Sequence, residues 1–330
     1  MVDRLRDSYD VVVIGGGAAG LSGALTLSRA LRRVVVLDSG RPRNAPAAGV
    51  HGLLGREGTE PAELLARGRA EVRRYGGEVV PGEVETVRRD ENGQGAATSF
   101  VVRLTDGSQT RARRLLVATG LADELPDIPG LSQRWGRDVL HCPYCHGWEA
   151  RHRTIGVLAT GPMSVHQALL LRQWSEHVRF FSRGRPVTNE QAEQLAARGI
   201  ATIDGEVVAL QIVDDTLLGV RLGDGSVVEL DFVAVSPRMV ARAGFLTELG
   251  LHPVPRPMGE SLAADATGRT DVPGVWVAGN VSDPMAQVGM AAAAGSAAAA
   301  QLNADLVTEE TERAVRTLRV IRSSASAAQR

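Results

Sequence analysis

The sequence contains no lysine, so all 37 of its basic residues are arginines. Without a lysine amine the protein cannot form a Schiff base, support pyridoxal catalysis or use a phosphate-loop lysine. Positive charge is not in excess either, because 38 acidic residues leave a net charge of −1. A nearly neutral chain has no field for holding nucleic acid or an anionic membrane, so we expect neither as a partner.

Long hydrophobic runs are also missing. A helix that crosses a bilayer needs about 20 apolar residues, and the Ala-rich stretch 286–300 is interrupted by glycines and polar residues. Its small residues predict a tightly packed helix instead. The charged N-terminus lacks the pattern of a signal peptide, which predicts a cytoplasmic location. At 330 residues and 44% hydrophobic content, the chain can fill two domain cores.

The first informative segment runs from residue 9 to residue 20 and reads YDVVVIGGGAAG. It predicts a buried strand, a glycine turn and then a helix, which is the setting that a dinucleotide fingerprint requires. Gly15 allows the tight turn, and Gly17 lets backbone amides approach a pyrophosphate at the helix N-terminus. Gly20 permits close packing of the helix on the strand.

An acidic residue completes this fingerprint. The next predicted strand, 34–37, is followed by Asp38, which lies 38 − 20 = 18 residues after the last glycine. A carboxylate at a spacing of about 20 residues binds the adenosine ribose in such sites. Strand, turn, helix and acid together predict nucleotide binding, and a merely structural glycine turn is the alternative.

A second copy of this unit appears 144 residues later. The segment 154–164 aligns with 10–20, and a further helix and a strand at 178–181 follow it. Gly15 corresponds to Ala159, Gly17 to Gly161, Gly20 to Ser164, and Asp38 to Ser182. Pro162 suits a first helical turn, so the fold signal is kept better than the binding signal. The chain therefore has an α/β pattern with two nucleotide-fold units.

A third segment, GVWVAGN at 274–280, predicts a strand that ends in a turn of small residues. A long helix should follow from near Pro284. Amides at such a helix start, with Asn280 as a hydrogen-bonding partner, suit the ring edge or ribityl chain of a cofactor. A structural turn is again the alternative.

Both cysteines of the chain, Cys142 and Cys145, lie between the two units. At this spacing they can close and reopen a small disulfide, and a nearby helix start would lower the pKa of one thiol. In a reducing cytoplasm this favours catalysis over structure. Zinc is a rival interpretation because His141 and His146 flank the pair, but the sequence has no second Cys pair or spaced His pair. The third interpretation is that the two thiols are inert.

These motifs together resemble the low-molecular-weight thioredoxin-reductase-like flavoproteins, over nearly the whole chain. The resemblance rests on the 15–20 turn, the linker Ala118-Thr-Gly120, the cysteine pair and segment 274–280. It implies two Rossmann-like units of the FAD/NAD(P)-binding fold, the second inserted in the first, and a homodimer. The FAD-binding domain would comprise 1–120 and 244–330, and an NAD(P)H-binding-like domain, 121–243, would carry the dithiol.

The departures from that family indicate a particular branch. Typical members have an acid directly after the second cysteine, where this chain has His146, and a well-formed NADPH turn. The run CPYCHGWE at 142–149 resembles instead the branch of the gliotoxin, holomycin and thiolutin dithiol oxidases, as does the segment from Arg43 to Gly52. By analogy that segment would lie over the flavin, and Cys145 would face the flavin while Cys142 exchanges with substrate.

Two histidines are candidate bases. The His146 imidazole, beside the dithiol, is suited to take a proton from a substrate thiol, and His51 is a second candidate near the flavin. Hydrogen bonds to a helix start and to a loop are their structural alternatives. Trp148 is expected to pack or to form a pocket wall, and Glu149 is expected on a helix surface.

The predicted catalytic residues are therefore Cys142, Cys145, His146 and His51, with no metal. The predicted cofactor-binding residues are Gly15, Gly17, Ala18, Ala19, Gly20, Asp38, Asn44, Ala118, Thr119, Gly120, Gly279, Asn280, Gln287 and Val288. FAD is the predicted cofactor, and use of NADPH is left open. The substrate would be a small-molecule dithiol or disulfide, with a thioredoxin-like protein as another candidate partner.

Three functions compete. The first is oxidation of a dithiol through FAD with oxygen as acceptor. The second is an NADPH-dependent disulfide reductase, since Arg183 and Arg185 follow the second unit's strand, where a 2′-phosphate needs cations. The third is a flavin-bound redox sensor that turns nothing over.

Overall fold

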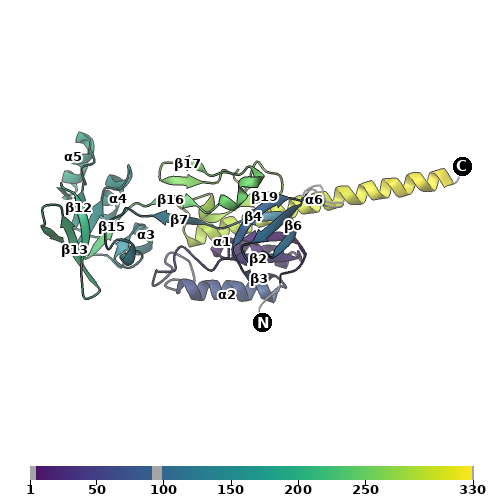
Figure 1. Ribbon diagram of the computed structural model, residues 1–330, viewed down its shortest axis with the longest axis horizontal. Helices are drawn as coiled ribbons and strands as arrows, with labels where there is room; N and C mark the ends of the chain where they lie inside the picture. Colours follow the sequence, from purple (N-terminus) through teal and green to yellow (C-terminus); the bar gives the residue numbers. More distant parts are fainter. Residues whose placement is uncertain (1–4, 91–98, 329–330) are drawn as a thin grey trace.

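The computed structural model describes residues 5–90 and 99–328. It has a mixed α/β fold, as the sequence predicts, and Figure 1 shows two lobes joined by β7 (Leu121–Glu124) and β16 (Arg238–Ala241). These two strands pair antiparallel. They belong to a four-stranded sheet in the order β17-β18-β16-β7, with β17 (Val254–Arg256) and β18 (Gly259–Ser261).

A seven-stranded sheet forms the first lobe, in the order β3-β2-β1-β6-β5-β4, with β19 also paired to β6. Side chains of its central strand, β1, point alternately into two apolar cores: Val11 and Val13 join one buried cluster, whereas Val12 and Ile14 join the other. Such continuous apolar runs are typical of parallel strands buried on both faces. The strands are β1 (Ser8–Ile14), β2 (Val34–Asp38), β3 (Glu78–Pro81), β4 (Val84–Arg89), β5 (Phe100–Leu104), β6 (Gln109–Val117) and β19 (Val275–Val277).

The second lobe contains a five-stranded parallel sheet in the order β11-β10-β9-β15-β8. A three-stranded antiparallel sheet, β12-β13-β14, packs beside it through a shared apolar cluster. The strands are β8 (Val139–Leu140), β9 (Ile155–Leu158), β10 (Val178–Phe181), β11 (Ala201–Ile203), β12 (Val207–Val213), β13 (Thr216–Leu222), β14 (Val227–Glu229) and β15 (Phe232–Ala234).

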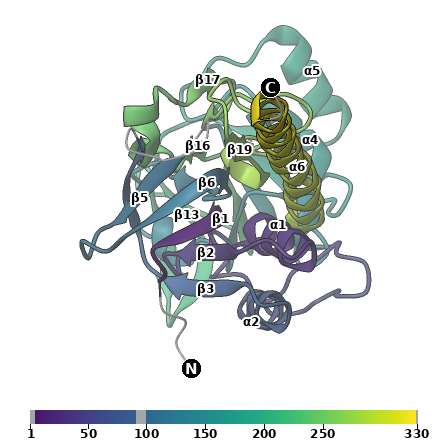
Figure 2. The same cartoon turned by 90° about the vertical axis from the view of Figure 1, so that its right-hand side faces the viewer.

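Helices α1 (Ala18–Arg29) and α6 (Val288–Ala328) pack against each other beside the first sheet (Figure 2). Their backbones approach closely, because a Cβ added to Gly295 would lie 1.9 Å from the backbone oxygen of Ala19. The tightly packed helix expected from the small residues is thus confirmed. It begins at Val288, four residues later than expected. Within the described residues, no helix is long and apolar enough to cross a membrane.

Buried and partly buried ion pairs fasten α6 to the sheet before the helix projects from the body (Figure 1). Arg114 on β6, 5% exposed, bonds Asp305 through Nε at 2.6 Å and lies 2.8 Å from Glu309. Its neighbour Arg113 bonds Glu309 and Glu310 at 3.0 and 2.7 Å. Burying these charges is tolerable only because each has a partner.

The remaining helices are all shorter than α6. The α-helices are α2 (Pro61–Arg74), α3 (Pro143–His146), α4 (Ser164–Leu171) and α5 (Asn189–Ala197), and the 3-10 turns are η1 (Ser132–Arg134), η2 (Gly244–Leu249) and η3 (Gly279–Val281). Helix α3 contains Cys145 and has Cys142 as its N-cap, and α4 follows the turn of the second nucleotide unit.

Candidate active site

The first glycine turn joins β1 to α1 and has the geometry that the fingerprint predicts. Gly15 has φ +108°, and a Cβ there would lie 2.4 Å from the backbone oxygen of Ala118. A Cβ on Gly20 would lie 1.9 Å from the backbone oxygen of Gly15, so this glycine keeps the helix close to the turn. Beside Gly17, by contrast, there is no protein atom within 4 Å of an added Cβ. The turn is therefore packed against the protein backbone at Gly15 and Gly20, and it is open at Gly17.

Polar groups at this opening suit a dinucleotide. Gly17 is the N-cap of α1, and no side chain caps the helix, so its first amides are available to an anion. The Asp38 carboxylate accepts hydrogen bonds from the amides of Gly16 and Gly40, both at 3.2 Å, through Oδ1 alone. Oδ2 of Asp38 is thereby left for a ribose hydroxyl.

A cavity of about 850 Å³ extends from this turn to the cysteine pair, near the upper end of the roughly 300–1,000 Å³ usual for ligand sites. Of the predicted cofactor-binding residues, all except the packed Gly20 line it. All four predicted catalytic residues line it as well. Predicted residues as far apart in the sequence as Gly15 and Val288 therefore line the same cavity.

The side-chain nitrogen of Asn280 already has partners within the protein. Its side-chain amide nitrogen donates to the backbone oxygens of Asp283 and Ala286 at 3.0 and 2.8 Å, and to that of Pro284 at 3.3 Å. The amide therefore holds the loop before α6, and only its oxygen remains for a ligand.

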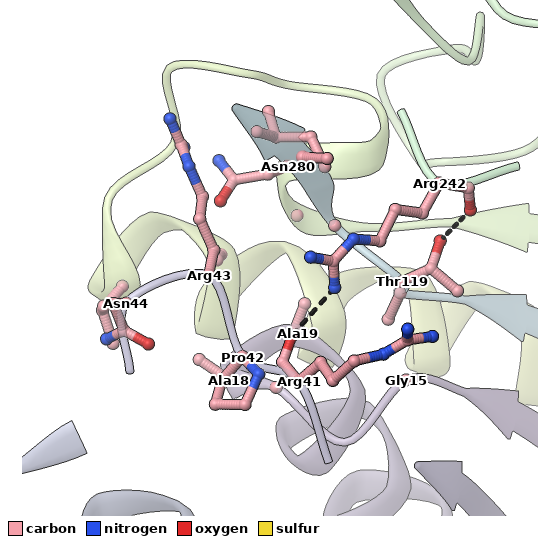
Figure 3. Close-up of a pocket in the computed structure, with 18 of the residues that line it drawn as sticks. Gly15, Ala18, Ala19, Arg41, Pro42, Arg43, Asn44, Thr119, Arg242 and Asn280 are labelled. Atoms are coloured by element: carbon pink, nitrogen blue, oxygen red, sulfur yellow. Dashed lines mark hydrogen bonds between the residues drawn. The ribbon is translucent and has the colours of Figure 1, made fainter. Parts of the chain in front are cut away.

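Three arginines around the cavity were not predicted as binding residues (Figure 3). Arg43 makes a two-pronged ion pair with Asp123 on β7, with both distances 2.7 Å. Arg242 donates to the backbone oxygen of Arg41 at 2.8 Å, and burial lowers the pKa of its guanidinium. These contacts tie the loop after β2 to the strands that connect the lobes, and sequence spacing gives no sign of them.

The cysteine pair sits at the start of α3. Cys142 is the N-cap and Pro143 opens the helix, while both thiols are free and half-buried. The Cys145 thiol donates a hydrogen bond that lowers the pKa of Cys142 to about 7, against the opposing effect of burial. Backbone amides of Cys145 and Tyr144 contribute in the same direction. The same hydrogen bond raises the pKa of Cys145, so Cys142 is the thiolate of the reduced pair.

The two candidate histidines both line the cavity and are close enough for the charge of His51 to affect His146. Nδ1 of His146 is buried without a hydrogen-bond partner. Burial lowers the pKa of His146, which the nearby Glu149 partly offsets. A lowered pKa keeps this imidazole neutral at pH 7 and so able to accept a proton.

His51 is held between two carboxylates. Its Nδ1 lies 2.6 Å from Glu57 and its Nε2 lies 3.6 Å from Glu149. The expectation of a helix position for Glu149 was wrong, because this residue lies in a turn after α3, where it faces His51 in the loop after β2. Trp148 is 65% exposed, stacks on Arg151 and is absent from the cavity wall. Within the described residues, no cluster of three His, Cys, Asp or Glu side chains is placed to hold a metal.

Comparison with known proteins defines the class. Residues 9–300 match the family model of the pyridine nucleotide-disulphide oxidoreductases, and the chain belongs to this family. It is an FAD-dependent thiol-disulfide oxidoreductase of the thioredoxin-reductase-like type. The resemblance noted in the sequence is thereby confirmed, and so is FAD as cofactor.

Individual relatives are similar over most of their length. The chain is 34% identical to thioredoxin reductase tcpT of Claviceps purpurea (strain 20.1), over 90% of this chain and 95% of that protein. It is 30% identical to thioredoxin reductase sirT of Leptosphaeria maculans, over 89% and 93%. Among solved structures, HlmI matches with a TM-score of 0.90 and 50% identity, over 97% of this chain and all of that one.

The residues around the cavity fit FAD. The open space beside Gly17, the uncapped amides of α1 and the carboxylate of Asp38 would hold its phosphates and ribose. When bound, FAD supplies a two-electron acceptor that can be reoxidised.

Proposed function

We propose that this protein oxidises a small-molecule dithiol to a disulfide and passes the electrons through FAD to oxygen. The observation that carries the proposal is the single cavity that reaches both the dinucleotide turn and the dithiol. A dithiol that opens onto the cofactor cavity can exchange with a substrate and transfer its electrons without a further protein partner.

The cysteines perform the exchange. In the oxidised enzyme, a substrate thiolate attacks Sγ of Cys142, the Cys142–Cys145 bond breaks, and Cys145 leaves as a thiolate. The second substrate thiolate then attacks the substrate sulfur of the mixed disulfide and releases Cys142. The substrate leaves with one new disulfide, and the enzyme pair holds the two electrons.

In the second step Cys142 is the leaving group, and its lowered pKa favours its departure from the mixed disulfide. The neutral His146 can take the proton of a substrate thiol. His51, held between Glu57 and Glu149, would pass that proton onward toward the surface.

The domain organisation belongs to the same proposal. We assign residues 1–120 and 244–330 to an FAD domain and 121–243 to the domain that carries the dithiol. The position of β7 and β16 between the lobes supports these limits. We further propose that the protein is a cytoplasmic homodimer, and that a thioredoxin-like protein is the alternative partner to a small-molecule substrate.

An NADPH-dependent reductase is the second candidate, and one observation favours it. Arg183 and Arg185 follow β10, and Nε of Arg183 is buried without a hydrogen-bond partner. A 2′-phosphate could use these cations. The preceding turn counts against NADPH, because Ala159 stands where the first turn has a glycine and Pro162 has no amide to donate to a phosphate.

The test compares two electron donors. Oxygen uptake is followed with dithiothreitol, and NADPH loss is followed at roughly 340 nm, where reduced nicotinamides absorb. We expect oxygen uptake to depend on the dithiol and on both cysteines, with little NADPH loss. NADPH consumption that equals or exceeds the dithiol rate would replace the oxidase by the reductase.

A further inference from the structure

The turn of the second nucleotide unit differs in detail from the first. It connects β9 to α4, as the first connects β1 to α1, and Ser164 takes the place of Gly20. The first turn cannot hold a side chain there, as the approach of Gly20 to Gly15 shows. In the second turn the backbone leaves room for one, and this side chain carries a hydroxyl.

The Ser164 hydroxyl is directed back into its own turn. Its oxygen accepts hydrogen bonds from the amides of Thr160 at 3.0 Å and Gly161 at 3.1 Å. Ser164 is only 1% exposed, so its hydroxyl is shielded from solvent, and the two amides are engaged with it. In a dinucleotide site, amides of this turn and of the helix start that follows it hold the pyrophosphate.

Two further features keep the turn in this state. Pro162 has no amide to offer a phosphate. The Thr160 hydroxyl donates to the backbone oxygen of Ser236 at 2.8 Å, and the Ser236 amide donates back at 3.1 Å. The turn is therefore fastened to the segment after β15, and the amides of Thr160 and Gly161 both have partners inside the protein.

We propose that Ser164 closes the second dinucleotide site, because its hydroxyl occupies the amides that a nicotinamide dinucleotide would need. The residue thus determines which redox partner the enzyme accepts. The inference deepens the proposed function, and rests on it for the preference for oxygen over NADPH. Arg183 and Arg185 remain near the position of an adenosine, so the site is blocked mainly at the pyrophosphate.

The experiment measures NADPH binding to the FAD-loaded, full-length protein by anaerobic calorimetry. Ser164→Ala removes the hydroxyl, and Ser164→Gly restores the residue of the first turn. The matched control is Ser175→Ala in the same lobe, because Ser175 is 2% exposed and its hydroxyl accepts from the His177 amide at 3.0 Å. Adenosine, which has no phosphate, serves as the control ligand.

We expect both Ser164 variants to bind NADPH at least about tenfold more tightly than the unaltered protein, since two amides become free for an anion. Ser175→Ala should bind as the unaltered protein does, and adenosine affinity should stay the same in every variant. Unfolding curves identify any variant that has lost its fold, and the other Ser164 variant then decides.

Two results would overturn the inference: tight NADPH binding by the unaltered protein, or no gain in a folded Ser164 variant. Oxygen uptake with dithiothreitol by the unaltered protein is measured separately. If uptake occurs but Ser164 variants gain nothing, the inference fails and the oxidase stands. If uptake is absent but the variants bind NADPH, the oxidase fails and the role of Ser164 stands.

Discussion

Removing the hydrogen bond from Cys145 should raise the pKa of Cys142. That bond is the largest cause of the Cys142 value of about 7. Cys145→Ala deletes the donor, whereas Cys145→Ser keeps a hydroxyl donor at the same position. An ordinary cysteine has a pKa of about 8.5, and burial raises it further. At pH 7 the thiolate fraction of Cys142 should therefore fall from about one half to about 3%, roughly 15-fold.

The assay is the pH dependence of alkylation by iodoacetamide, followed by mass. Each variant has a single thiol, because the chain contains only two cysteines. We expect a midpoint near pH 7 in Cys145→Ser and at about 8.5 or above in Cys145→Ala. The midpoint is the informative quantity, because a more basic thiolate is also intrinsically more nucleophilic. In urea both variants should titrate alike. Equal midpoints in the two folded variants would refute the assignment of Cys142 as the stabilised thiolate.

Three other predictions follow from the same structure. Gly17→Val should yield colourless protein without FAD, because the side chain enters the open space beside the turn, whereas Gly161→Val, with equally open space in the second turn, should keep its flavin absorbance. His146→Ala should slow dithiol oxidation at pH 7 but leave the alkylation midpoint of Cys142 unchanged, because burial keeps the imidazole neutral; a shifted midpoint would mean that His146 is charged. Glu310→Gln should reduce the free energy of unfolding by about 1 kcal/mol at pH 7, the value expected for a partly exposed ion pair. Hydrogen bonds from Arg32 and Arg113 lower the pKa of Glu310 from 4.5 to about 2. The difference in unfolding free energy between the variant and the unaltered protein should therefore be constant above pH 4.5 and disappear as the pH falls toward 2. A difference that persists at pH 2 in chemical denaturation would contradict this prediction.

The glycine turn could be predicted from sequence because its determinants are local. Gly15 needs a positive φ, and Gly20 must lie against Gly15 five residues earlier. Both requirements follow from the connection of one strand to one helix, so spacing alone reveals them. The dithiol was equally visible, because one cysteine lies in a short helix and the other is its N-cap.

Contacts between distant segments could not be predicted in this way. Glu149 meets His51 only because the loop after β2 folds against the turn after α3. Arg113 and Arg114 are adjacent on β6, and nothing in the sequence of that strand indicates carboxylates on a helix nearly 200 residues later. The sequence shows that Ser164 stands where the first turn has a glycine, but it does not show that the hydroxyl points back into its own turn.

The most direct test of the central claim is anaerobic mixing of the oxidised, FAD-loaded protein with one electron donor at a time. A small dithiol should bleach the flavin, and readmitted air should restore its colour, while NADPH at the same concentration should bleach it much more slowly. Rapid bleaching by NADPH with little effect of the dithiol would contradict the account, and would make the protein a reductase.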